Sequence, residues 1–223
     1  MRALKSKTTE RNKDGFLYDP DEAIKYLASV DTTLGRLIVR AGPFKMQLHR
    51  LHNPFEAMSR NIIHQQLHGN AAEAIHRRVM ALFGKQKLHP QDILDATEES
   101  LRGAGLSGAK LAALKDLAAK TLDGTVPTLT RLRRLGDEEI IEHLTQVRGI
   151  GRWTVEMLLI SRLGRPDVLP VGDFAVRKGF QLTYQLEEMP KPKALAEYGE
   201  RWRPFRSVAS WYMWQAVGLN RRK

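Results

Sequence analysis

The sequence VRGIGRWTVEMLLI, residues Val147 to Ile160, places two glycines around one isoleucine and continues with an arginine, a tryptophan and an apolar run. Residues 137–146 before it and the residues from Trp153 onward both have apolar side chains at helical spacing. Only six residues remain to connect the two segments, so the sequence predicts two helices joined by a tight turn. Gly149 and Gly151 leave the backbone of that turn bare, so an outside group can approach the peptide itself.

A bare turn ahead of a helix is suited to holding a phosphate. The N–H groups at the start of the second helix carry a partial positive charge and point outward. Arg148 and Arg152 would add positive charge, while Ile150 would anchor the turn inward. Short glycine turns also join helices in proteins without such a ligand, so the turn alone does not establish a phosphate site.

The composition indicates a globular protein that attracts a polyanion. The chain has 223 residues, 42% of them hydrophobic, and 36 Lys and Arg against 25 Asp and Glu give a formal net charge of +11. This excess favours nucleic acid as a partner, although it also suits plain solubility. The lack of cysteine excludes disulfides, cysteine nucleophiles and cysteine-ligated iron–sulfur clusters. The polar first residues and the lack of a long apolar run predict neither a secretory signal nor a membrane partner.

Apolar residues recur at spacings of three and four along the chain, and no segment alternates as a strand would. We therefore expect an all-α fold. The segments with this spacing are Phe55 to Ile63, Ile75 to Phe83, Leu111 to Leu117 and Ile140 to Leu144. Two tryptophans of the C-terminal segment, Trp202 and Trp211, are expected to be ordinary core residues.

The segment VRGIGRWT resembles the hairpin of the helix-hairpin-helix DNA glycosylases, and the resemblance extends over residues 50–215. Within that superfamily the chain is most similar to the 3-methyladenine DNA glycosylase II branch. The resemblance implies that the following residues contact the DNA backbone: Arg148, Gly149, Ile150, Gly151, Arg152 and Thr154. It also implies a sodium or potassium ion held by the carbonyls of Val147, Gly149 and Ile150, with no catalytic metal, no iron–sulfur cluster and no small-molecule cofactor.

The resemblance implies two helical lobes, with the helix-hairpin-helix motif beside the cleft between them. We expect one lobe to hold residues 15–54 and 171–219, and the other to hold residues 55–170. Residues 1–14 are expected to be a mobile basic N-terminus, and residues 220–223 a basic tail. Only about fifty residues precede the motif NPFEAM. We therefore expect the β-rich N-terminal domain of the longest bacterial members to be absent.

Asp173 follows an apolar run, residues 168–171, and opens another helix. From its position alone it is a helix cap, the common role of an aspartate there. The resemblance instead assigns to Asp173 the role of the catalytic aspartate. Cleavage of an N-glycosidic bond builds positive charge on the sugar, and a carboxylate stabilises that charge and can orient or deprotonate the attacking water. No second acid is needed when the leaving base already carries a positive charge.

Aromatic residues near Asp173 are expected to bind the damaged base. Trp214 matches the pocket tryptophan of the alkylpurine enzymes, and Trp153, Met157 and Phe174 would complete the pocket. An electron-rich ring facing a cationic base gains about 0.5 to 2 kcal/mol. Trp153 also stands where strand-cutting members carry a lysine nucleophile, and tryptophan cannot form the Schiff base. The resemblance therefore implies a monofunctional hydrolase that leaves an abasic site.

The sequence RNIIHQQLHGNAA, residues 60–72, resembles the segment that enters the minor groove while a base is flipped out. By position, Gln66 is the plug, Leu67 follows it into the groove and His68 is a minor-groove probe. The alternative is that these polar residues simply end a helix. His64 and His68 also have the spacing of a zinc helix, but Gln65 stands where a metalloprotease needs glutamate, so we do not expect zinc.

We interpret the chain as a monofunctional DNA glycosylase of base excision repair that flips alkylated purines out of double-stranded DNA. The expected substrates are 3-methyladenine and 7-methylguanine, with ethenoadenine and hypoxanthine as further candidates. Two alternatives stay open: a non-catalytic helix-hairpin-helix DNA-binding protein, and a glycosylase that also cuts the strand. We expect a monomer, located in the cytoplasm with the nucleoid in a bacterium, or in the nucleus of a eukaryote.

Overall fold

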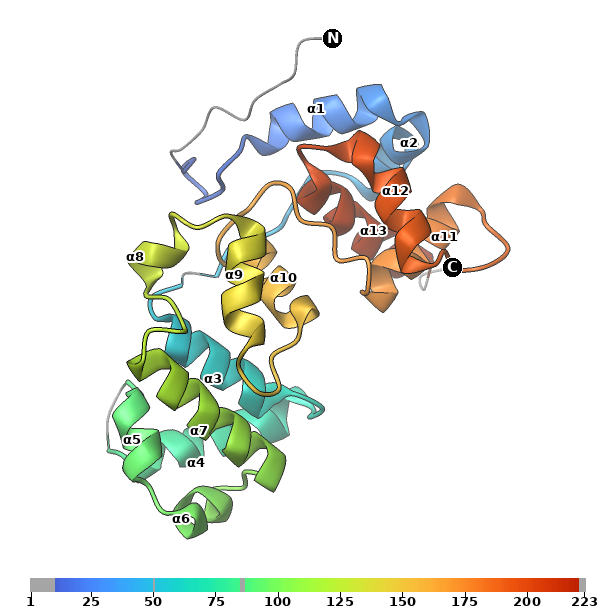
Figure 1. Ribbon diagram of the computed structural model, residues 1–223. Helices are drawn as coiled ribbons and strands as arrows, with labels where there is room; N and C mark the ends of the chain where they lie inside the picture. Colours follow the sequence, from blue (N-terminus) through green and yellow to red (C-terminus); the bar gives the residue numbers. More distant parts are fainter. Residues whose placement is uncertain (1–10, 50, 85–86, 221–223) are drawn as a thin grey trace. The chain divides into compact units, whose positions relative to one another are not determined.

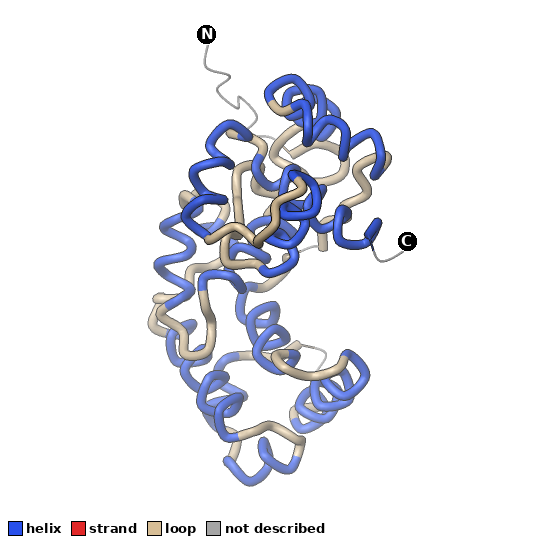
Figure 2. The backbone as a smooth tube through the Cα atoms, turned by 90° about the vertical axis from the view of Figure 1, so that its right-hand side faces the viewer, coloured by secondary structure: helices blue, strands red, loops and turns tan. Residues whose placement is uncertain are grey.

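The computed structural model describes residues 11–49, 51–84 and 87–220, and within these ranges it contains helices and loops without strands (Figure 2). The expected all-α fold is therefore confirmed. The helices are α1 (Pro20–Val30), α2 (Thr32–Ala41), α3 (Pro54–His64), α4 (Gly69–Leu82), α5 (Pro90–Asp95), α6 (Glu98–Gly103), α7 (Gly108–Leu122), α8 (Leu129–Leu132), α9 (Asp137–Thr145), α10 (Arg152–Ser161), α11 (Phe174–Tyr184), α12 (Pro192–Gly199), the 3-10 helix η1 (Glu200–Trp202) and α13 (Arg206–Asn220). None of the described helices is long and apolar enough to cross a membrane.

The chain divides into two compact units. The first unit comprises residues 1–50 and 156–223, and the second comprises residues 51–155. The expected tail lies outside the described residues except for residue 220, and so does most of the expected mobile N-terminus. The expected boundary at residue 170 is wrong, because residues 156–170 belong to the first unit. Their loop is held there by hydrogen bonds, since Leu17 N donates to Gly164 O at 3.2 Å and Ser207 N donates to Pro166 O at 2.9 Å.

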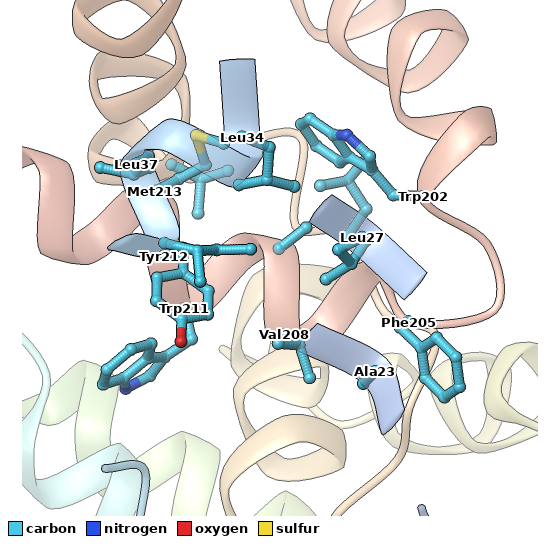
Figure 3. Close-up of a cluster of buried hydrophobic side chains, with 14 of the residues drawn as sticks. Ala23, Leu27, Leu34, Leu37, Trp202, Phe205, Val208, Trp211, Tyr212 and Met213 are labelled. Atoms are coloured by element: carbon cyan, nitrogen blue, oxygen red, sulfur yellow. The ribbon is translucent and has the colours of Figure 1, made fainter. Parts of the chain in front are cut away.

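The first unit has an aromatic core contributed by α1, α2, α11 and the C-terminal helices. Figure 3 shows Trp202 and Phe205 near Leu27 of α1, and Tyr212 beside Trp211 in the same buried cluster. Trp202 is fully buried and Trp211 is 9% exposed, so both are core residues as expected. The core thus joins the N-terminal helices to a segment more than 160 residues later in the chain, and this packing fixes α11 and α13.

A buried carboxylate, Asp31, lies between α1 and α2 and gathers donors from three other segments. Its Oδ2 accepts hydrogen bonds from Tyr184 Oη at 2.6 Å, Trp202 Nε1 at 3.0 Å and Tyr198 Oη at 3.2 Å, and its Oδ1 accepts from Leu34 N at 3.0 Å. Burial alone would raise the pKa of Asp31, but these hydrogen bonds outweigh it and lower the pKa below its ordinary value. The group is a structural anchor because every donor is part of the surrounding core.

Helices α11 and α13 cross at very close range, and Gly179 makes this possible. A Cβ atom at Gly179 would lie 2.0 Å from Met213 O, which no side chain can tolerate. Glycine in a helix interior is intrinsically unfavourable, so its presence here is explained by the backbone contact. Trp214 follows Met213 directly, and the close crossing therefore sets the position of Trp214 against α11.

The second unit consists of short helices packed around α3 and α7 (Figure 1). Helix α7 packs against both α3 and α5. The apolar faces predicted for α3 and α7 therefore meet in the core of the second unit. The fully buried residues of this core include Met58, Ile62, Ile63, Ile93, Leu114 and Leu117.

Candidate functional site

The predicted glycine turn joins α9 to α10 (Figure 1). Gly149 has φ +78°, in the left-handed region that favours glycine, so the conformational reason for this glycine is confirmed. Ile150 is 4% exposed and anchors the turn inward as expected, whereas Arg148 and Arg152 are exposed. The turn is therefore a hairpin anchored by Ile150, with its two glycines and its two arginines exposed.

Gly151 has a different explanation from Gly149. A Cβ at Gly151 would meet nothing within 4 Å, so no contact among the described residues requires glycine there. Thr154 and Val155 donate the first helical hydrogen bonds, both to Gly151 O, at 3.0 and 3.3 Å. Helix α10 thus begins directly at the turn, where the positive end of a helix suits an anion, and glycine at position 151 leaves room for one to approach.

Helix α7 braces the hairpin through two residues that the sequence did not identify. Asp116 Oδ2 accepts a hydrogen bond from Arg148 N at 2.7 Å, and Lys120 Nζ lies 2.9 Å from the same oxygen. Lys120 Nζ also donates to Gln146 O at 2.5 Å. Burial acts to raise the pKa of Asp116, but the Arg148 N–H and the Lys120 ammonium outweigh it and lower the pKa. The only sequence signal was the i,i+4 spacing of Asp116 and Lys120 on a predicted helix.

The two hairpin arginines differ in their present partners. Arg152 forms a two-pronged ion pair with Glu138 of α9, with N–O distances of 3.0 and 2.5 Å, and both side chains are more than half exposed. Arg152 must therefore exchange this partner before it can contact a phosphate. The side chain of Arg148 has no ion pair among the described residues, so its charge is available.

The loop between α3 and α4 contains the three residues predicted to enter the minor groove, and all three are exposed. Gln66 has φ +56°, a left-handed conformation that costs a residue other than glycine roughly 1 kcal/mol. Leu67 is 39% exposed, unusual for a large apolar side chain, and His68 precedes α4 without capping it through its side chain. The loop does end a helix, but its strained backbone and exposed leucine exceed what a helix end requires.

Two of the three carbonyls expected to hold an alkali ion, those of Val147 and Gly149, already accept hydrogen bonds from the protein. Gln65 Nε2 donates to Gly149 O at 2.8 Å, and Ile150 N donates to Val147 O at 3.0 Å. A carbonyl oxygen has two lone pairs, so these bonds leave one acceptor site on each oxygen and the residues fit such an ion. Gln65 was considered in the sequence only as the residue that argues against zinc, and its contact with the hairpin was not foreseen.

Asp173 is 8% exposed and caps α11, so the simpler interpretation of this residue is confirmed. Its Oδ1 accepts hydrogen bonds from Val176 N at 2.7 Å and from Trp214 Nε1 at 3.1 Å. Both donors bind one and the same oxygen. The cap and the indole therefore fix the orientation of the carboxyl group, as a catalytic carboxylate requires.

The residues expected to form the base pocket are divided between the two units. Asp173, Phe174 and Trp214 belong to the first unit, as does Met157, whereas Trp153 belongs to the second. Trp214 directs its N–H to the carboxylate, a contact that sequence reasoning did not foresee. Phe174 is 66% exposed and Trp153 is 52% exposed, so both rings present large apolar surfaces to solvent.

A surface pocket of the first unit lies elsewhere. It is lined by residues of α2 and by the C-terminal end of α11, among them Arg36, Arg40, Thr183 and Gln185. Asp173 precedes the opposite end of α11, about 16 Å away at 1.5 Å per residue. This pocket is therefore not the place where a base would meet Asp173.

Comparisons with known proteins agree with these features. A family model described as HhH-GPD superfamily base excision DNA repair protein matches residues 60–204. DNA-3-methyladenine glycosylase 1 of Schizosaccharomyces pombe is 37% identical over 196 residues, 87% of this chain and 86% of that protein. The solved DNA-3-methyladenine glycosidase of Bacillus halodurans has a TM-score of 0.81 at 34% identity, over 90% of this chain and 91% of that one. The Schizosaccharomyces pombe enzyme Mag1 in complex with abasic DNA has a TM-score of 0.73 at 36% identity, over 87% and 95%.

The chain therefore belongs to the HhH-GPD superfamily of base excision DNA repair proteins. The relatives place it among the DNA glycosylases of alkylation repair, so the resemblance drawn from the hairpin is confirmed.

Proposed function

We propose that this chain hydrolyses the N-glycosidic bond of alkylated purines in double-stranded DNA and leaves an abasic site. The observation that carries the proposal is the buried carboxylate of Asp173, oriented by Val176 N and Trp214 Nε1 in a glycosylase fold. The similarity to Mag1, which was solved with abasic DNA, supports DNA as the partner. We propose 3-methyladenine and 7-methylguanine as main substrates, with ethenoadenine and hypoxanthine as further ones.

The chemistry follows from the positive charge of the substrate base. The bond between C1′ and the base nitrogen breaks, and its electron pair leaves with the base, which becomes neutral. The Asp173 carboxylate stabilises the positive charge that develops on the sugar. A water oxygen then bonds to C1′, and its proton passes to the carboxylate or to solvent. A neutral purine lacks this leaving tendency and the attraction of the aromatic faces of Phe174 and Trp214, so selection by charge favours alkylated bases.

We propose that the hairpin and the loop between α3 and α4 hold the DNA while the base is out of the helix. Arg148 and the N-terminal end of α10 would contact phosphates, and Gln66 would fill the gap left by the base. The carbonyls of Val147, Gly149 and Ile150 would hold a sodium or potassium ion, which brings positive charge to the same phosphate. We further propose a monomer, working at the nucleoid of a bacterium or in a nucleus, without a small-molecule cofactor.

Trp153 supports hydrolysis without strand cutting. A lyase needs an amine that attacks C1′ and forms a Schiff base, and the indole of Trp153 has no such nucleophile. Trp153 is exposed at the start of α10, and the resemblance to the superfamily implies that strand-cutting members carry lysine at this position. We therefore expect the phosphodiester backbone to stay intact after base release.

The test is incubation of the protein with duplex DNA treated with a methylating agent, followed by chromatography of the released bases. The proposal predicts release of 3-methyladenine or 7-methylguanine and no covalent protein–DNA adduct after borohydride reduction. DNA binding without any base release would instead support a non-catalytic binding protein. A borohydride-trapped adduct together with cut strands would support the lyase alternative and would contradict the role given to Trp153.

A further inference from the structure

Two exposed loops of the second unit are joined by a single side chain. Gln65 follows the last residue of α3, and its Nε2 donates a hydrogen bond to Gly149 O in the hairpin at 2.8 Å. The two residues lie 84 positions apart in the chain. The donor belongs to the loop that carries Gln66, and the acceptor belongs to the turn after α9 (Figure 1).

Helix α7 forms hydrogen bonds with the chain close to both partners of this bond. Near its start, Lys110 Nζ donates to Ile63 O in the last turn of α3 at 2.7 Å. Six residues later, about 9 Å along the helix, Asp116 accepts the N–H of Arg148. Burial lowers the pKa of Lys110, and the carbonyl that it contacts satisfies one of its donors. Helix α7 therefore fixes one side of each loop, and the Gln65 bond connects their other sides directly.

The position of this bond matters because both loops would hold the same DNA. The backbone at Gln66 is strained, and Gln66, Leu67 and His68 are exposed, so little else in the loop restrains it. Ordering a flexible loop on binding costs conformational entropy and so weakens the affinity for DNA. A contact that already orders the loop in the free protein removes part of that cost. A single hydrogen bond of this kind corresponds to about a twofold to tenfold change in an equilibrium constant.

We propose that Gln65 is a positioning residue that fixes the spacing between the minor-groove loop, residues 65–68, and the phosphate-binding hairpin, residues 147–152. This inference rests on the proposed function, which gives both loops to one DNA duplex. In this arrangement the amide of Gln65 donates to the hairpin carbonyl and does not contact DNA itself. It affects DNA binding only by holding the loop and the hairpin at a fixed spacing. Insertion at Gln66 and phosphate binding at Arg148 then occur as one coupled event.

The first test needs no DNA. Gln65→Met keeps the length of the side chain but has no donor, and Gln65→Glu places a carboxylate against the Gly149 carbonyl. We expect amide hydrogen exchange at residues 148–151 to become about threefold to tenfold faster in both variants, with the larger effect in Gln65→Glu. Gln91→Met is the matched control, because Gln91 Nε2 donates only to Asp95 Oδ1 within α5. Unchanged exchange in the hairpin of folded Gln65 variants would overturn the proposal.

The second test measures coupling on a duplex that contains a stable abasic-site analogue. We expect Gln65→Met to weaken binding about threefold to tenfold, and to have a much smaller effect in an Arg148→Ala background, where the hairpin no longer binds its phosphate. Additive effects would mean that Gln65 contacts DNA by itself, and would refute the positioning role. Neither test depends on base release. A protein that fails to excise methylated bases would refute the proposed function, and the effect of Gln65 on the two loops could still be measured.

Discussion

Asp173 caps a helix, and the catalytic role that we propose falls on the same side chain. The carboxyl group caps α11 through Val176 N, and the same oxygen receives the indole N–H of Trp214. A cap restrains the carboxyl group more tightly than packing alone would, because both donors belong to helices. The two interpretations that the sequence left open are therefore compatible, and the cap contributes to the orientation that the chemistry requires.

Gln66 allows fold stability and DNA binding to be separated within a single residue. We expect Gln66→Gly to keep or raise the free energy of unfolding by up to about 1 kcal/mol, because the strain at φ +56° is relieved. We expect the same variant to bind an abasic duplex about tenfold more weakly, since the plug is missing. Urea unfolding and fluorescence anisotropy measure the two effects.

The matched control is Gln185→Gly, because Gln185 has φ +54° at the end of α11 and takes no part in the proposed DNA contacts. Gln185→Gly should keep or raise the free energy of unfolding, as Gln66→Gly does, and should leave the affinity for DNA unchanged. Equal loss of affinity in the two variants would contradict the role given to Gln66.

At the scale of helices, the close crossing of α11 and α13 determines how Trp214 meets Asp173. We expect Gly179→Ala to destabilise the protein by about 1–3 kcal/mol or more, because the added Cβ would lie 2.0 Å from Met213 O. The helices must separate, which lengthens the bond from Trp214 Nε1 to Asp173, so base release should also slow in the fraction that stays folded. Urea unfolding and single-turnover release measure these effects.

Gly218→Ala is the control for this crossing, because a Cβ at Gly218 of α13 would meet nothing within 4 Å. Alanine has the higher helix propensity, so this variant should be as stable as the parent or up to about 1 kcal/mol more stable. If Gly179→Ala were equally harmless, the close crossing would not be what positions Trp214.

The brace between α7 and the hairpin has a defined pH dependence. The folded protein lowers the pKa of Asp116 below 3.8, so the carboxylate contributes stability that is fully present above pH 3.8 and is lost as the pH falls through the folded pKa. We expect the amide resonance of Arg148 to titrate with a midpoint below 3.8, and this transition to vanish in Asp116→Asn. A midpoint above 3.8 would mean that the hydrogen bond from Arg148 N does not stabilise the charged carboxylate.

The sequence predicted what depends on local pattern and missed what depends on distant partners. The helices, the left-handed Gly149 and the buried Ile150 follow from spacing and turn chemistry within a few residues. The bond from Gln65 to Gly149 and the donors gathered around Asp31 join residues 84 to 171 positions apart, and no periodicity encodes such a pairing. Gly179 could have been recognised, because a glycine inside the helix FAVRKGFQLTY indicates a close backbone contact.

For the whole molecule, the net charge of +11 predicts DNA binding that weakens steeply with salt. Each phosphate contact contributes about 0.9 to the slope of log K against log salt concentration. We expect Arg148→Ala to reduce the slope by about one, and Arg152→Ala to reduce it less, because Arg152 is already paired with Glu138. Glu138→Gln should raise DNA affinity, since it frees that arginine. Equal slopes for the parent and Arg148→Ala would contradict the phosphate contact.

The reaction that we propose depends on the negative charge of one side chain, Asp173. Asp173→Asn removes the charge but keeps a good helix cap, so α11 should still begin at the same residue. Asp19→Asn is the matched control, because Asp19 caps α1 in the same way.

The most direct test is single-turnover release of 7-methylguanine from a duplex, measured beside the affinity of each variant for an abasic duplex. The account predicts that Asp173→Asn slows release at least about a hundredfold while affinity stays within about twofold, and that Asp19→Asn changes neither. Release by Asp173→Asn at the rate of the parent protein would contradict it.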